Sequence, residues 1–172
     1  MEQFLRYWMR WPSVEHLIYR HLWVWGVCQS LHFVGMALLI GTVGILDLRI
    51  LGMAKQFPVP ALKKLIPWGV FGFVLCLATG LLFVTGIYAN INVHPYVVLQ
   101  SDVFLQIKFV FILLAGVNLL LFYATGMSRA VDRLAEGDEA PPLARVFAGA
   151  SLFFWIAVMY FARLIPSGKF QP

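Results

Sequence analysis

The sequence predicts an all-α integral membrane protein, a four-helix bundle with an N-terminal interfacial amphipathic helix. Three observations predict this class. The chain of 172 residues is 61% hydrophobic and only 12% charged, whereas soluble domains are about 45 to 50% apolar. Its mean hydropathy is +0.82. Four apolar stretches are each long enough to cross a bilayer, which takes about 20 helical residues.

These stretches predict membrane-spanning helices at about 22–46, 65–89, 103–127 and 146–163. Each is expected to be helical because a backbone in lipid must satisfy its own hydrogen bonds. The length leaves no room for a separate soluble catalytic domain, so we expect one membrane domain over residues 1–172. No basic surface interleaved with aromatic residues suggests a nucleic-acid partner. We therefore expect the four helices to contact a lipid bilayer.

The first residues predict an amphipathic segment in the membrane interface. Phe4, Trp8 and Trp11 fall on one side of this segment, while Arg6 and Arg10 fall elsewhere. Aromatic residues opposed to cations are typical of helices that lie at the bilayer surface.

The first spanning helix is expected to begin before the membrane. Ser13 is the expected N-cap, and no residue between it and Asp47 would clearly break a helix. The connections at 52–64 and 128–145 contain prolines and charges, and the second is expected to form a charged helix followed by a loop.

Cationic residues predict the orientation. The face with the two charged connections holds seven Lys and Arg residues, against five on the face with both termini. Cytoplasmic loops are enriched in Lys and Arg. We therefore expect both termini outside, in the inner (cytoplasmic) membrane of a bacterium.

A histidine in the first span is the main functional signal. His32 lies in the middle of the uncharged stretch 22–46, and an ionisable residue inside a span is a functional-site hypothesis by default. Cys28 and Met36 stand one helical turn before and after it, and His21 three turns earlier. One face of a single helix is therefore expected to carry nitrogen and sulfur donors, a pattern typical of a redox cofactor or a soft metal.

Two cations are expected in the same half of the membrane as His32. Lys108 lies five residues into the third span, and Arg163 closes the fourth. Either could instead snorkel to the headgroups. A cationic pair beside a buried imidazole favours an anionic ligand with an extended apolar body, such as a haem with its propionates or a quinone headgroup.

The leading hypothesis is a b-type haem in the outer half of the bundle, with His32 as the axial ligand and Lys108 and Arg163 at the propionates. The second iron ligand would come from Met36, His94 or Lys108, or be absent. Such a protein would pass electrons between a quinone or partner and an external redox protein. The sequence leaves open whether it is an enzyme.

Two other functions stay open. Thiolate and thioether donors select Cu(I), so a column of Cys28, His32 and Met36, with Met159 on the last helix, could transport copper. Alternatively, His32 only hydrogen-bonds a neighbouring helix, and the chain is a noncatalytic anchor or assembly subunit of a larger membrane complex.

Other polar and small residues in the spans are expected to be structural. Thr79, Thr85 and Asn118 should form interhelical hydrogen bonds, and Asp47 and Arg49 should pair or cap at the inner face. Six glycines are expected to let helices approach closely or make room for a flat macrocycle: Gly35, Gly41, Gly44, Gly72, Gly80 and Gly116.

Several segments together resemble a known family. The run SLHFVGMALLIGTVGILDLRILG, a second span containing TG, and then QIKFVFILLAGVNLLLFY and FFWIAVMYFARLI resemble an uncharacterised bacterial group of four-helix membrane proteins allied to the copper-resistance CopD type. The likeness extends from about Ser30 to Ile165. More loosely, a first-helix His with a third-helix Lys is similar to the HemJ type of haem-binding membrane protein. That likeness implies His32 as iron ligand and Lys108 close to the haem, but the other polar signatures of HemJ are missing here, so its reaction is not carried over.

Overall fold

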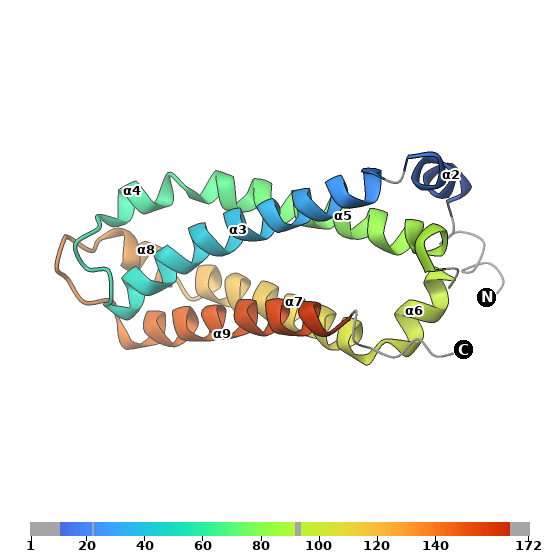
Figure 1. Cartoon of the computed structure of the whole chain (residues 1–172). Helices are drawn as coiled ribbons and strands as arrows, with labels where there is room; N and C mark the ends of the chain where they lie inside the picture. The colour runs from blue at the N-terminus through green and yellow to red at the C-terminus, as the bar shows by residue number, and fades with distance from the viewer. Residues whose placement is uncertain (1–10, 22, 92–93, 166–172) are drawn as a thin grey trace. The chain divides into compact units, whose positions relative to one another are not determined.

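The predicted fold class, an all-α membrane four-helix bundle, is confirmed. A computed structural model describes residues 11–21, 23–91 and 94–165, and all regular structure within them is helical (Figure 1). Four helical stretches are long and apolar enough to cross a membrane: Trp23–Leu51, Val59–Gly86, Val103–Ala124 and Pro142–Leu164. The chain is therefore a multi-pass membrane protein. The expected amphipathic segment ahead of Trp11 lies outside the described residues.

The described helices follow one another along the chain with short connections, and they are α2 (Pro12–Arg20), α3 (Trp23–Leu51), α4 (Val59–Lys63), α5 (Ile66–Ile91), α6 (Pro95–Ser101), α7 (Val103–Ala124), α8 (Met127–Asp132) and α9 (Pro142–Leu164). The third span ends earlier than expected because Gly126 adopts a left-handed φ of 74°, which ends the helix and starts α8. The charged connection forms the expected short helix, α8, followed by a loop.

The chain divides into two compact units. The first has the limits Met1–Leu39 and Val70–Val103, and the second Ile40–Gly69 and Phe104–Pro172. Helices α3 and α5 each contribute to both units. The expectation of a single membrane domain stays a prediction.

In the first unit, α3 and α5 approach closely at two glycines. A Cβ added to Gly35 would lie 2.8 Å from the carbonyl oxygen of Gly72, and a Cβ on Gly72 would lie 2.6 Å from the carbonyl oxygen of Gly35. No side chain fits at either position, so these glycines let the backbones touch as predicted. Gly41 and Gly116 do not mark such an approach, since a Cβ on either would meet no described atom within 4 Å, and the alternative, that they make room for a macrocycle, stays a prediction.

The first helix does not run unbroken from Ser13. Helix α2 has Trp11 as its N-cap and Pro12 in its first turn, where proline is favoured because its missing N–H would be unsatisfied anyway. The chain leaves the helix at His21, whose backbone has φ −134° and ψ 80°, and α3 begins at Trp23. The expected Ser13 cap and the single helix to Asp47 are therefore wrong.

Packing explains the break. Gly86 of α5 receives the side chain of Ile18, which a Cβ on that glycine would overlap, and Val14 lies 3.4 Å from the same point. Burying this apolar side of α2 against α5 requires the chain to change direction before α3. Tertiary contact thus overrides the helical propensity of the sequence.

The second unit has a core of small and β-branched residues. Its buried members come from α3, α4, α8, α9 and the loop before α9, and they are Ile50, Val59, Val131, Ala140, Ala144 and Ala148. Alanines on α9 allow the larger side chains of the other helices to pack closely against it.

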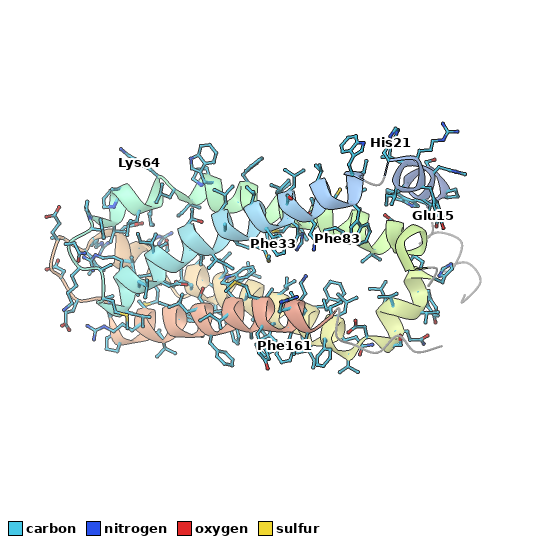
Figure 2. All side chains as sticks on the ribbon, in the orientation of Figure 1. Glu15, His21, Phe33, Lys64, Phe83 and Phe161 are labelled. Carbon is cyan, nitrogen blue, oxygen red and sulfur yellow. The ribbon has the colours of Figure 1, made fainter. Side chains whose placement is uncertain are left out.

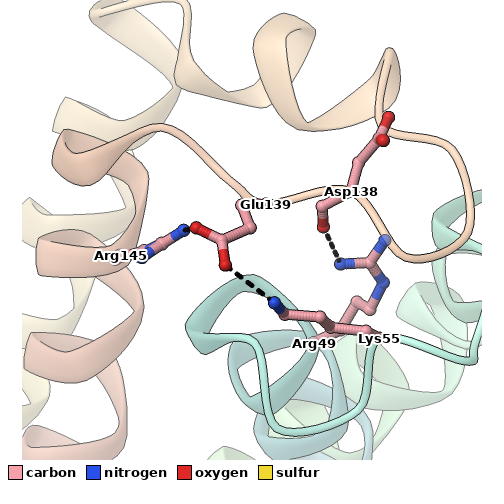
Figure 3. A network of polar contacts seen from close by, with 5 residues as sticks. All are labelled: Arg49, Lys55, Asp138, Glu139 and Arg145. Carbon is pink, nitrogen blue, oxygen red and sulfur yellow. Dashed lines mark hydrogen bonds and ion pairs between the residues drawn. The ribbon is translucent and has the colours of Figure 1, made fainter.

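A buried arginine ties the connections of this unit together. The Arg49 side chain is 0% exposed. Its guanidinium donates from Nε to the Phe57 carbonyl at 2.9 Å and from one terminal nitrogen to the Ala135 carbonyl at 2.8 Å. The other terminal nitrogen donates to the Asp138 carbonyl at 3.1 Å (Figure 3). One side chain therefore satisfies three loop carbonyls.

Asp47 and Arg49 do not pair with each other, so the pairing alternative of that expectation is wrong. The Ser151 hydroxyl of α9 hydrogen-bonds to the Asp47 carboxyl group. Residues two apart stand about 200° apart around a helix, so Asp47 and Arg49 point to different neighbours.

Candidate functional site

His32 makes a specific contact between two helices. Its side chain lies on α3 in the first unit, where Nδ1 is 2.7 Å from Oγ1 of Thr79 on α5. Thr79 itself is buried, with 3% of its surface exposed. The prediction that Thr79 forms an interhelical hydrogen bond is confirmed.

The direction of this hydrogen bond follows from the partners of Thr79. Its hydroxyl donates to the Leu75 carbonyl at 2.6 Å. A hydroxyl has one hydrogen, so toward His32 the Thr79 oxygen accepts and Nδ1–H donates. In the neutral ring, Nε2 then carries the lone pair that can act as an acceptor or bind a metal.

The rest of the His32 environment comes from the same face of α5. A Cβ on Gly80 would lie 3.8 Å from the ring carbon Cε1, and the Phe83 ring centroid is 5.3 Å from the imidazole, at 59°. The Cys76 thiol lies 3.5 Å from the His32 carbonyl oxygen. Phe83, labelled in Figure 2 on α5, also contacts the ring of Trp25 at 5.2 Å.

Sequence reasoning singled out Gly80 and Thr79 but missed Cys76 and Phe83 as neighbours of His32. A signal for them was present, because positions 76, 80 and 83 follow the helical spacing of one face. What the sequence lacked was the register between α3 and α5, which the Gly35 and Gly72 contact determines.

Three of the four predicted nitrogen and sulfur donors lie on one helix. Cys28, His32 and Met36 all lie on α3 and are half-buried. His21 lies beyond the end of α2 and is exposed, so its place in this column is wrong. The reason is the break between α2 and α3.

The two predicted cations belong to the second unit. Phe104 and Phe111 of α7 contact the Phe161 ring of α9 at 6.5 and 5.6 Å. These contacts bring the start of α7 beside the end of α9, so Lys108 and Arg163 lie at the same end of this unit. Lys108 is half-buried and Arg163 is exposed.

His32 and the two cations therefore belong to different units, and a shared binding site stays a prediction. Among the described residues, no three His, Cys, Asp or Glu side chains gather closely enough to hold a metal ion.

His94 has a structural role at the start of α6. Its Nδ1 accepts a hydrogen bond from the Tyr96 amide at 3.2 Å, so the side chain caps the helix. In the neutral ring the proton is then on Nε2, so this nitrogen has no lone pair for a metal. Nδ1 could ligate a metal only by giving up the helix cap.

Of the two other predicted interhelical hydrogen bonds, the one from Asn118 is confirmed and the one from Thr85 is wrong. The amide of Asn118 on α7 donates to the Phe147 carbonyl of α9 at 3.1 Å, which confirms an interhelical bond. The Thr85 hydroxyl instead donates to the Leu81 carbonyl of its own helix at 2.9 Å, so that prediction is wrong. Hydroxyls in helices commonly make this bond to the preceding turn.

No family model, no curated protein and no solved structure matches the chain.

Proposed function

We propose that this membrane protein binds one b-type haem with Nε2 of His32 as the axial iron ligand and serves as an electron-transfer component. The observation that carries the proposal is the hydrogen-bond chain from His32 Nδ1 through Thr79 Oγ1 to the Leu75 carbonyl. Metal-ligating histidines almost always donate their other ring N–H in this way, because the bond orients the ring and makes the ligating nitrogen more basic.

The surroundings of His32 suit an apolar macrocycle better than a small cation. Glycine at position 80 lines the ring edge without a side chain, and Phe83 supplies an aromatic face. The neighbouring Thr79 hydroxyl is already committed to His32 and Leu75. His32 thus offers an imidazole beside a glycine and an aromatic ring, a setting that suits haem.

These contacts favour a single protein ligand from the first unit. Met36 lies one turn from His32 on the same helix. His94 is engaged in its helix cap. His32 would therefore hold the iron from the first unit, and Met36 would contact the edge of the haem.

Lys108 and Arg163 would bind the propionates. Their placement at one end of the second unit supports this role, because two carboxylates need two cationic partners in a medium of low dielectric constant. When bound, the haem supplies one-electron oxidation and reduction, and the chain orients it and keeps water from the ligating nitrogen.

The proposal also includes an orientation in the membrane and two redox partners. The seven cations around the charged connections favour a cytoplasmic location for that side, with both termini outside a bacterial inner membrane. A quinone on the membrane side and an external redox protein are the proposed partners. Kinship with the CopD type, and more loosely with HemJ, rests on the resemblance alone.

The absorption spectrum of the purified protein, as isolated and after addition of hemin, tests the proposal. We expect a Soret band that His32→Ala removes and that added imidazole restores. His21→Ala is the matched control, since it removes an exposed imidazole near α3, and should leave the band unchanged. A wild-type protein without a Soret band, or one whose band survives His32→Ala, overturns the proposal.

The hydrogen bond from His32 to Thr79 is also what the anchor hypothesis expects, so the absorption spectrum has to separate that hypothesis from haem binding. For the Cu(I) column, Cys28 and Met36 lie half-buried on α3 one turn before and after His32, but the described residues hold no group of three His, Cys, Asp or Glu side chains close enough for a metal ion. Copper that binds to the wild type and is lost in Cys28→Ser/Met36→Leu would favour transport. A colourless protein that co-purifies with a larger complex would favour the anchor.

A further inference from the structure

Helix α2 lies in the first unit, directly ahead of the first apolar span. Its Ile18 and Val14 side chains pack at Gly86 of α5, and the first span begins at Trp23, just after α2. Figure 1 shows α2 nearly end-on, whereas α3 and α5 run across the picture. Helix α2 thus packs against α5 and does not continue into α3.

The two sides of α2 differ in chemistry. Glu15, its only acidic residue, is 5% exposed and Ile18 is 6% exposed, so both belong to the inner side. His16 and Arg20, four residues apart, form an exposed row on the outer side. In Figure 2 the labelled Glu15 and His21 mark this helix and its end.

Apolar side chains flank this row. Leu17 is 49% and Tyr19 is 53% exposed, and they stand on either side of the His16 and Arg20 row around the helix. Trp11 and Trp23, at the two ends of α2, are 45% and 67% exposed. Exposed Trp and Tyr next to the start of a spanning helix are typical of side chains among lipid headgroups.

We propose that the outer side of α2 binds the phosphate of an anionic phospholipid headgroup through Arg20 and His16, with Leu17 and Tyr19 against the acyl chains. The planar guanidinium matches phosphate oxygens in a bidentate manner, and the His16 ring supplies an N–H donor. Glu15, the acidic residue of α2, lies on the inner side and not in this row. The proposal is independent of haem binding.

Native mass spectrometry of the full chain in detergent doped with equal amounts of dioleoylphosphatidylglycerol and dioleoylphosphatidylcholine tests it. We expect bound lipid to be enriched in phosphatidylglycerol. Arg20→Gln should lower the enrichment about fivefold, the contribution of one cation near an anionic surface, and His16→Gln/Arg20→Gln should lower it further. Arg20→Lys should keep part of it, since charge remains without the fork.

Arg129→Gln is the matched control, because it removes an exposed cation from α8. It should leave the contribution of α2 intact, and equal thermal melting of all variants shows that each is folded. Equal enrichment in wild type and His16→Gln/Arg20→Gln overturns the proposal. So does displacement of the lipid by millimolar inorganic phosphate, which would indicate a site for the free anion.

Discussion

Gly35 and Gly72 each lie where a side chain on one would strike the carbonyl oxygen of the other. This close approach sets the register of α3 on α5 and thereby brings His32 to Thr79. The arrangement of the proposed ligand therefore depends on two residues that have no side chain.

Gly72→Ala should destabilise the first unit by about 1 to 3 kcal/mol, the usual cost of inserting an extra group into a packed contact. Thermal unfolding in detergent measures this effect. Gly41→Ala is the control, since a Cβ there meets no described atom within 4 Å, and it should be neutral or slightly stabilising. Equal losses at both positions would contradict the close approach.

Thr79→Val should remove the acceptor of His32 Nδ1 at nearly constant volume. Nitrogen-15 NMR of labelled histidine should report protonation at Nδ1 in the wild type and a changed tautomer mixture in the variant. If haem binds, its affinity should fall about 10- to 100-fold, as for other losses of an outer hydrogen bond to a ligand. Thr79→Ser should restore both properties. Thr85→Val, which removes a hydroxyl bonded within its own helix, should change neither.

Arg49→Lys should destabilise the second unit. An ammonium group cannot reach all three carbonyls that the guanidinium fork bonds, and each buried carbonyl left without a donor costs about 1 to 3 kcal/mol. Limited proteolysis of the two charged connections, together with thermal unfolding, measures the loss. Arg133→Lys, at an exposed position of the same connection, should have little effect. An unchanged Arg49→Lys protein would argue against the carbonyl contacts.

Glu139 should make a small, pH-dependent contribution to the connections. Its carboxylate bonds to Lys55 at 2.8 Å and to Arg145 at 2.5 Å (Figure 3). These hydrogen bonds and charges lower the pKa of Glu139 from 4.5 to about 2. Because the folded-state pKa is depressed, the stabilisation is fully present above about pH 4.5 and is lost as the pH falls toward 2.

The melting temperatures of wild type and Glu139→Gln, compared from pH 6 to pH 2, measure this contribution. The difference should shrink over that window and also at high salt, since all three side chains are partly or largely exposed. Glu136→Gln removes one charge from the same loop as a control. A difference that persists at pH 2 would show that the effect is not ionic.

Much of the candidate site was predictable from the sequence, but its geometry was not. Hydropathy identified His32 as an imidazole inside a span. Thr79 was predicted to form an interhelical hydrogen bond because it is a polar residue inside the second span. Their contact could not be predicted, because they are 47 residues apart and local pattern carries no information on the register of two helices. The prediction of an unbroken helix through His21 was wrong for the same reason, because the packing of Ile18 on Gly86 outweighs local helix propensity.

The sequence by itself determined the fold class and the four spans, because transfer of a helix into lipid depends on hydropathy summed over consecutive residues. Only the tertiary structure decided which nitrogen of His32 carries the proton, which carbonyls Arg49 satisfies and where the first helix breaks. Each of these depends on the atom that lies opposite a given side chain, and that atom comes from a distant part of the chain. In a bilayer, nearly any apolar side chain can face lipid, whereas a polar group needs one particular partner.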